Sequence, residues 1–180
     1  MAFWHRSERR NPQIDALSGK DLWLVRHGEP DPMRGNRLSA VGEAHAGQAI
    51  SRLQRHGFVA PFLIVTSPAA RAVDTANYMV SDLTKQQPSH CETPLFESEA
   101  FRHLSTKPEE FDNPDVLLGR VVIEACETLH THPCHLRAVA FVGHEPFMRV
   151  VKQSMGLRGH VGYGEVLTYD VGQLQSAQQV

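Results

Sequence analysis

The stretch "DLWLVRHGEP", residues 21–30, sets an apolar run directly before an arginine, a histidine and a glycine. Residues 22–25 lack the polar alternation of a half-exposed strand, so they predict a strand that is buried on both faces. Strands of this kind belong to parallel sheets covered by helices, and ligands of such sheets bind at the carboxyl ends of the strands. Arg26 and His27 therefore stand where a ligand site is expected.

The rest of the chain alternates short apolar runs with helical patterns. Further strands are expected at 62–66, 92–96 and 138–143, and an edge strand or hairpin at 163–171 that turns at Gly164. Helices are expected after the capping residues Ser39 and Ser67–Pro68, over 115–130, and from Pro146 to Gly156. This alternation predicts a three-layer α/β/α sandwich with a mostly parallel central sheet.

Length and composition favour a single domain. The chain has 180 residues, 41% of them hydrophobic and 21% charged, with a formal net charge of -2. We expect residues 1–20 to form a flexible arm and residues 21–180 to form the domain. The small net charge gives no general attraction to nucleic acid or to an anionic membrane, so neither is expected as a partner. No run resembles a signal peptide or a membrane span.

The cysteines favour a reducing compartment. Cys91, Cys126 and Cys134 are an odd number at irregular spacing. A small disulfide-stabilised secreted domain usually has an even set. We therefore expect a cytoplasmic protein.

Polar side chains follow three of the expected strands. Arg26 and His27 follow the first, Arg71 follows the second shortly after Ser67, and His144 follows the last. Arginine offers a planar, permanently charged fork, and histidine can act as nucleophile, acid or donor near neutral pH. Phosphate has enough oxygens to occupy both arginines and both imidazoles, so a phosphate site is predicted at this edge of the sheet.

Four motifs in this order resemble those of the histidine phosphatase superfamily, which includes phosphoglycerate mutases, acid phosphatases and small bacterial phosphohistidine phosphatases. "LVRHGEP" is similar to the RHG signature. The others are "RLSAVGEAHA" (37–46), "VTSPAARAVDTA" (65–76) and "VAFVGHEP" (139–146), the last of which is nearest in wording to the phosphohistidine phosphatases. The resemblance covers roughly residues 21–156 and implies a phosphoglycerate mutase-like fold.

The resemblance implies a metal-independent phosphatase that needs no cofactor. His27 would accept the phosphoryl group, forming a phosphohistidine that water then hydrolyses. Arg26, Arg71 and His144 would bind the phosphate oxygens, and Gly28 would let phosphate and backbone approach closely. The substrate would be a phosphorylated small molecule or a phosphohistidine-bearing protein.

The resemblance also implies a general acid after the third expected strand. Glu97 and Glu99 both stand there in "TPLFESEAF". Glu97 follows Leu95 with the spacing of a common L-x-E pattern of the family and is the preferred choice, with Glu99 as the alternative. A phosphoramidate substrate would need this acid less than an ester.

Three alternatives compete with the phosphatase hypothesis. A mutase would need a lid, for which the span between Arg71 and His144 leaves little room. A non-catalytic phosphate-binding module would not need both histidines and both arginines. The cluster "LHTHPCHL" (129–136) has the residue types of a zinc site, although a polar loop is favoured. Arg34 and Arg37, in the loop that follows the first motif, could extend the anion site but are expected to be exposed loop residues.

Overall fold

The computed structural model describes residues 11–58, 62–86, 95–103 and 114–171. The strands are β1 (Asp21–Arg26), β2 (Pro30–Asp31), β3 (Arg37–Leu38), β4 (Phe62–Thr66), β5 (Leu95–Glu97), β6 (Ala138–Gly143) and β7 (Val166–Tyr169). The α-helices are α1 (Pro12–Leu17), α2 (Ala40–Arg55), α3 (Ala70–Gln86), α4 (Ala100–His103), α5 (Pro114–Thr128) and α6 (Glu145–Ser154). Two short 3-10 helices are η1 (Pro32–Arg34) and η3 (Pro133–His135).

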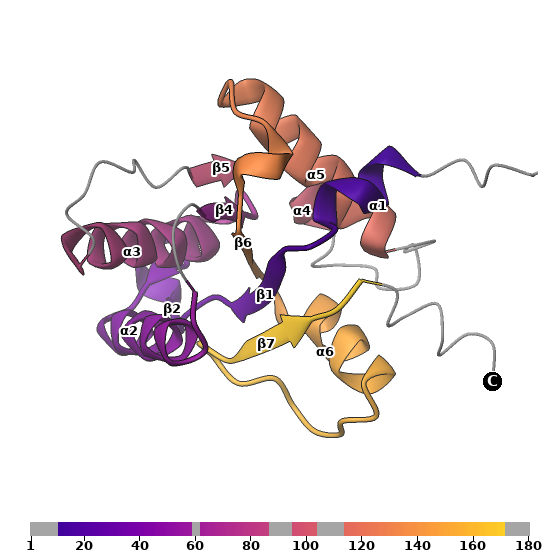
Figure 1. Cartoon of the computed structure of the whole chain (residues 1–180). Coiled ribbons are helices and arrows are strands. Elements are labelled where there is room, and N and C mark those ends of the chain that lie inside the picture. Colours follow the sequence, from indigo (N-terminus) through magenta and orange to yellow (C-terminus); the bar gives the residue numbers. More distant parts are fainter. Residues whose placement is uncertain (1–10, 59–61, 87–94, 104–113, 172–180) are drawn as a thin grey trace, which may run out of the picture.

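A five-stranded sheet with the order β5-β4-β6-β1-β7 forms the centre of the molecule (Figure 1). β4, β5, β6 and β1 run parallel, and β7 pairs antiparallel with β1 at one edge. A separate two-stranded hairpin joins β2 to β3. Every residue of β4 and β6 is buried, as their uninterrupted apolar sequences predict.

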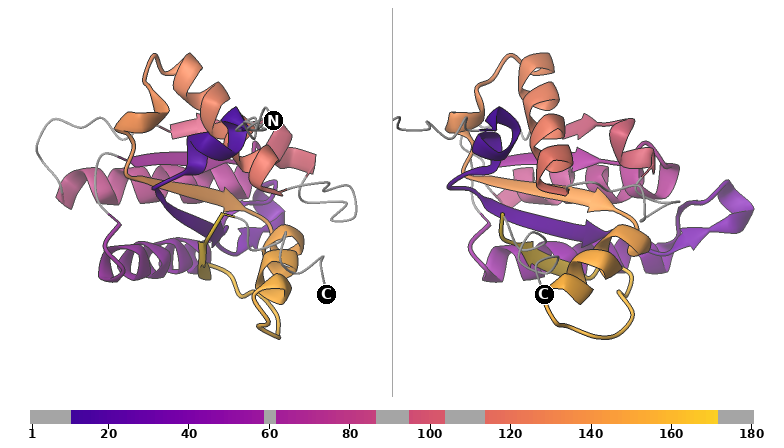
Figure 2. Two further views of the ribbon diagram at one scale, coloured as in Figure 1. Left: turned by 45° about the vertical axis from the view of Figure 1, so that its right-hand side comes forward. Right: turned by 90° about the vertical axis from the view of Figure 1, so that its right-hand side faces the viewer.

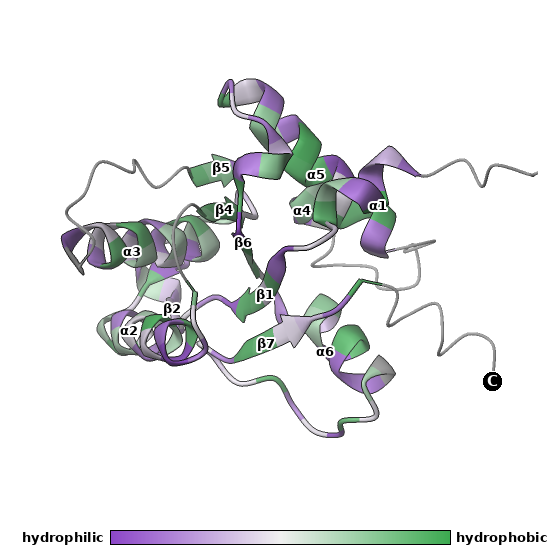
Figure 3. Cartoon of the chain, in the orientation of Figure 1, coloured by the Kyte–Doolittle hydropathy of each residue, from purple (hydrophilic) through white to green (hydrophobic). Residues whose placement is uncertain are grey.

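Helices cover both faces of the sheet, which gives the predicted three layers (Figure 2). Each face of the sheet has its own hydrophobic core, and successive residues of β1 point alternately into one core and the other. Leu22 and Leu24 pack with α1, α5 and α6 on one face, whereas Trp23 and Val25 pack with α2 and α3 on the other. The helices α2 and α3 mix hydrophobic and hydrophilic residues, whereas the strands β4 and β5 are mainly hydrophobic (Figure 3).

The expected capping residues have the predicted neighbours. Ser39 is the N-cap of α2, and its Oγ accepts the backbone N–H of Gly42 at 2.9 Å. Ser67 Oγ accepts the backbone N–H of Ala69 at 3.3 Å, and α3 begins one residue later, at Ala70. The segment predicted at 92–96 forms β5 from Leu95 onward, and residues 92–94 lie outside the described part of the chain.

The predicted flexible arm does not fit residues 12–17, which form α1. Asn11 caps this helix, and Leu17 is fully buried in the core beside α5. Backbone packing is close here, since a Cβ at Gly119 of α5 would lie 1.8 Å from the carbonyl oxygen of Gln13. Residues 1–10 of the expected arm lie outside the described part of the chain.

The carboxyl ends of the three central strands meet at one edge of the sheet. The His27 backbone N–H donates to Gly143 O at 3.0 Å, and the Ser67 N–H donates to Val142 O at 3.1 Å. The residues after β1, β4 and β6 are thereby fixed side by side. This backbone frame positions the candidate site.

Candidate active site

The structure brings Arg26, His27, Arg71 and His144 together in one cleft of about 410 Å³. The Arg71 Nε–H donates to His27 Nε2 at 3.0 Å, and Arg71 Nη2 lies 3.5 Å from His144 Nδ1. The rings of His27 and His144 are 5.1 Å apart between centroids. The remaining lining residues are Pro30, Asn36, Glu145, Pro146 and Tyr163.

The tautomer of His27 is fixed by its two neighbours. His27 Nδ1 lies 2.7 Å from the carbonyl oxygen of Gly28, which can only accept, so Nδ1 carries the proton. Arg71 donates to the other nitrogen, so Nε2 is unprotonated. Burial is the main reason that the pKa of His27 falls to about 3; His144, Arg71 and Arg26 contribute to the decrease, and the Gly28 hydrogen bond opposes it. The imidazole is therefore neutral at physiological pH, with the lone pair of Nε2 on the cleft side.

The His144 side chain contacts Ser67, which lies between β4 and α3. His144 Nε2 lies 2.9 Å from Ser67 Oγ, a contact that is fully buried. Burial lowers the pKa of His144 to about 4, with smaller contributions from Arg71 and Arg26. Ser67, which the sequence predicts only as a helix cap, thus also orients the second histidine of the site.

Arg26 is 9% exposed and holds an unused donor. Its Nη1 donates to Val161 O and lies 3.0 Å from His160 Nε2. Within the described part of the chain its buried Nε has no hydrogen-bond partner. Burial lowers the pKa of the guanidinium, and nearby Tyr163 offsets part of this effect. A buried, unpaired N–H is unfavourable, so an oxygen acceptor at this position would be bound strongly.

Thr75 connects the segment that follows β1 to α3. The backbone N–H of Gly28 donates to Thr75 Oγ1 at 3.0 Å, and Thr75 Oγ1 donates to the carbonyl of Arg71 at 2.7 Å. Thr75 is fully buried. This link fixes the backbones that carry His27 and Arg71 relative to each other.

The structure gives Gly28 a packing role, which the sequence did not predict. A Cβ at Gly28 would lie 2.4 Å from the carbonyl oxygen of Gly42 in the first turn of α2. Any larger residue would therefore push this helix away from the end of β1. Gly28 is required for helix packing, and its carbonyl orients His27.

The two candidate acids lie apart from this group. Glu97 ends β5 and is paired in register with Thr66 at the outer edge of the sheet. Its side chain is exposed, and Glu99 forms an exposed ion pair with Arg102 at 2.8 Å. Neither belongs to the described lining of the cleft, where the carboxylate is Glu145.

The loop arginines differ from each other. Arg37 forms a bidentate pair with Asp74, at 2.7 and 3.1 Å. This pairing raises the pKa of Arg37 and lowers that of the Asp74 carboxyl. Arg34 is exposed and lines a separate depression with Arg37. Neither lines the cleft.

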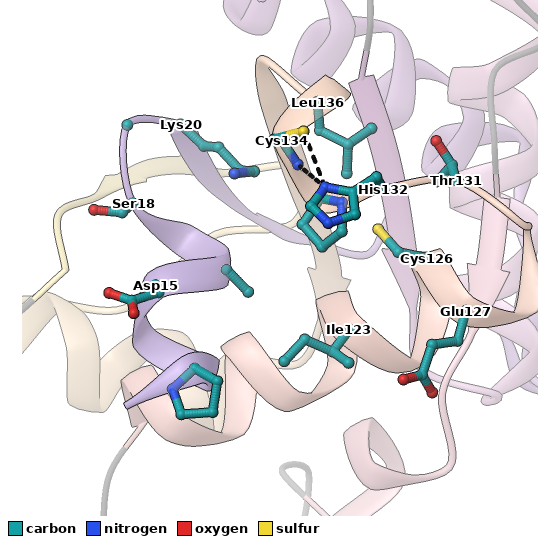
Figure 4. Close-up of a pocket in the computed structure, with 14 residues that line it drawn as sticks. Asp15, Ser18, Lys20, Ile123, Cys126, Glu127, Thr131, His132, Cys134 and Leu136 are labelled. Atoms are coloured by element: carbon teal, nitrogen blue, oxygen red, sulfur yellow. Dashed lines mark hydrogen bonds between the residues drawn. The ribbon is translucent and has the colours of Figure 1, made fainter. Parts of the chain in front are cut away.

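The His/Cys cluster of residues 129–136 lies at the opposite end of the sheet. His132 and Cys134 line a second cavity, of about 630 Å³, together with Lys20 before β1 and Cys126 of α5 (Figure 4). His132 Nδ1 lies 2.9 Å from Cys134 Sγ. In the described part of the chain, no group of three or more His, Cys, Asp or Glu side chains is placed to hold a metal ion.

Sequence reasoning missed Tyr163, His160, Thr75 and Asn36. The first two come from the segment between α6 and β7, where they contact Arg26. Thr75 lies inside a matched motif without a role assigned to it. Asn36 has a φ of 58°, a conformation that is uncommon outside glycine and often marks functional loops.

Comparisons with known proteins agree with the fold and with three of the four motifs. Residues 22–102 match the family model of the histidine phosphatase superfamily (branch 1). A search of curated proteins finds no significant match. None of the described helices combines the length and apolar character that crossing a membrane requires.

Several solved structures share the fold at low sequence identity. The SixA protein of Agrobacterium tumefaciens, which bears the name of a phosphohistidine phosphatase, has a TM-score of 0.55 and 14% identity, covering 85% of this chain and 91% of its own. A mycobacterial glucosyl-3-phosphoglycerate phosphatase complexed with VO3 has a TM-score of 0.51 and 17% identity, covering 84% and 92%. Mycobacterial hydrolase 2 has a TM-score of 0.51 and 17% identity, covering 86% and 84%. Residues 22–102 thus match the histidine phosphatase superfamily model, and the chain shares its fold with these solved structures.

Proposed function

We propose that this chain is a phosphatase that hydrolyses a phosphomonoester or a phosphoramidate through a phosphohistidine on His27. The observation that carries the proposal is the state of His27. Its Nδ1–H is held by Gly28 O, its pKa is low, and its Nε2 lone pair lies beside Arg71 in the cleft. A nucleophile needs such an unprotonated, oriented nitrogen, whose lone pair here accepts the Arg71 Nε–H until substrate binds.

In the first step, His27 Nε2 attacks phosphorus while the bond to the leaving oxygen or nitrogen breaks. The leaving group departs with the bonding electron pair and takes up a proton. In the second step, water attacks the phosphohistidine, the P–N bond breaks, and Nε2 recovers its lone pair as inorganic phosphate is released. Arg26 and Arg71 stabilise the charge on the non-bridging oxygens in both steps.

Substrate binding must replace one contact of the unliganded site. The Arg71 Nε–H that donates to His27 Nε2 has to turn to a phosphate oxygen, which frees the lone pair for attack. We expect the Arg26 Nε–H, which has no acceptor among the described residues, to gain one in the same event. The dianionic phosphate thus couples binding to activation of the nucleophile.

An ester leaving group needs a proton donor as it departs. Glu97 remains the proposed donor and Glu99 the alternative, although both side chains are exposed. A substrate whose leaving group is a histidine nitrogen would need this donor less, because a protonated nitrogen leaves readily. We therefore propose a phosphohistidine-bearing protein as one substrate class and a small phosphate ester as the other.

The proposed location is the cytoplasm. Cys126 and Cys134 are free thiols, as a reducing compartment would keep them. Neither a nucleic acid nor a membrane is proposed as a partner.

The test is turnover of p-nitrophenyl phosphate and of a phosphoramidate by wild type, His27→Gln and the control His135→Ala. His135 is exposed on η3, away from the cleft. We expect His27→Gln to be inactive and His135→Ala to match wild type. Hydrolysis by His27→Gln at the wild-type rate would refute the proposal, and so would a wild type that turns over no phosphorylated compound in a broad panel.

A further inference from the structure

The segment between α6 and β7 lies against the active-site arginine through one aromatic ring. The guanidinium carbon of Arg26 is 4.1 Å from the centroid of the Tyr163 ring, and the His27 ring is 5.7 Å from it. We infer that Tyr163 is a positioning residue, which holds the guanidinium plane of Arg26 in the orientation that binds an anion. This inference rests on the proposed function.

The main chain keeps Tyr163 beside Arg26. The Gly164 N–H donates to Arg26 O at 3.1 Å, and the Arg26 N–H donates to Glu165 O at 3.0 Å. These bonds continue the pairing of β1 with β7 up to the last residue of β1. Tyr163 is therefore tethered next to Arg26 by the sheet itself and is not carried by a free loop.

The opposite side of the segment is pressed onto α2. Gly164 has a φ of +65°, and a Cβ there would lie 2.4 Å from His45 O. Arg52 Nη1 donates to Gly164 O at 3.1 Å, and the His45 ring stacks on Tyr163 with centroids 5.8 Å apart. The half-buried Tyr163 ring thus lies between His45 of α2 on one side and Arg26 and His27 on the other.

Stacking suits the chemistry of the site because it leaves the donors of Arg26 free. The N–H groups of a guanidinium lie in its plane, whereas the ring occupies one face. Nη1 is used by Val161 O and His160, whereas the Nε–H has no hydrogen-bond partner among the described residues. An arginine that is already oriented loses less conformational freedom when phosphate binds, so the ring should strengthen phosphate affinity.

The inference predicts a loss confined to anion binding. Tyr163→Leu removes the flat face, and we expect the dissociation constant of inorganic phosphate and the KM to rise about tenfold. The kcat should change less than threefold, since the ring orients Arg26 equally in the ground and transition states. Tyr163→Phe keeps the ring and should stay within twofold of wild type. Tyr78→Leu, on the exposed part of α3, is the matched control.

The measurements are phosphate titration by calorimetry, steady-state kinetics, and thermal unfolding of each variant. If Tyr163→Leu fails to fold, Tyr163→Met replaces it, because methionine is similar in length and lacks a ring. Wild-type phosphate affinity in the ringless variant would overturn the inference, and so would an equal loss in Tyr163→Phe, which would point to the hydroxyl. A wild type that binds phosphate without turnover would refute the phosphatase proposal alone, and the affinity comparison would still decide the role of Tyr163. A wild type that does not bind phosphate would overturn both.

Discussion

Replacement of Arg71 by alanine tests the electrostatic part of the mechanism. Arg71 contacts both histidines, at 3.0 Å to His27 Nε2 and 3.5 Å to His144 Nδ1. Removing one preorganised charged donor typically costs about 10²–10³ in kcat, or about 3–4 kcal/mol of transition-state stabilisation. We expect Arg71→Ala to lose at least two orders of magnitude in kcat with p-nitrophenyl phosphate. Arg71→Lys should recover only part of this, because lysine keeps the charge without the planar fork.

The pH profile of this variant carries a second signature. Arg71 is one of the charges that lower the pKa of His27, so its removal raises that pKa. The acid limb of kcat/KM, which reports the free enzyme, should therefore move to higher pH in Arg71→Ala. Arg34→Ala, at an exposed position outside the cleft, is the control and should stay within twofold of wild type. A loss of tenfold or less in Arg71→Ala, or an equal loss in Arg34→Ala, would refute the assigned role.

Three further predictions concern the neighbours of the nucleophile. Ser67→Ala removes the buried partner of His144 Nε2 and should lower kcat about tenfold in steady-state assays; an unchanged kcat would show that Ser67 only caps α3. The folded pKa values of His27 and His144, about 3 and about 4, lie below the usual 6.5. The unfolded chain therefore binds more protons, so this stability is complete above about pH 6.5. It falls as the pH drops to about 4 for His144 and to about 3 for His27, by up to about 1.4 kcal/mol per pH unit per histidine. Urea unfolding at several pH values should show that the free energy of unfolding depends less steeply on pH in His144→Asn than in wild type. An identical pH dependence would contradict a buried, neutral His144 imidazole. Gly28→Ala places a Cβ 2.4 Å from Gly42 O and should cost about 1–3 kcal/mol in urea unfolding, whereas wild-type stability would mean that α2 yields at no cost.

Much of the fold could be predicted because the central strands are continuous apolar runs. Such runs are typical of strands buried in a parallel sheet, and each is followed directly by a polar residue. They are residues 22–25, 62–66 and 138–143. The convergence of His27, Arg71 and His144 follows from that geometry. Short polar segments were harder to predict from the sequence. The helix α1 is an example, because it is stabilised by packing on α5 and not by its own sequence.

The parts of the site that were missed depend on tertiary contacts. Tyr163 and His160 belong to a segment without regular periodicity, and only the pairing of β7 with β1 carries them to Arg26. The packing role of Gly28 was missed for the same reason, because its neighbour Gly42 belongs to a separate helix. Spacing within one motif carries no information about such contacts.

The isomer of the phosphorylated histidine tests the central claim most directly. Rapid quenching of wild type with a phosphoramidate, followed by mass spectrometry and phosphorus NMR of the alkali-stable product, identifies both the residue and the ring nitrogen that carry phosphate. Gly28 O holds Nδ1 at 2.7 Å, so the phosphoryl group should be found on Nε2 of His27. Phosphate on Nδ1 or on another residue would contradict the account, as would turnover without any trapped intermediate.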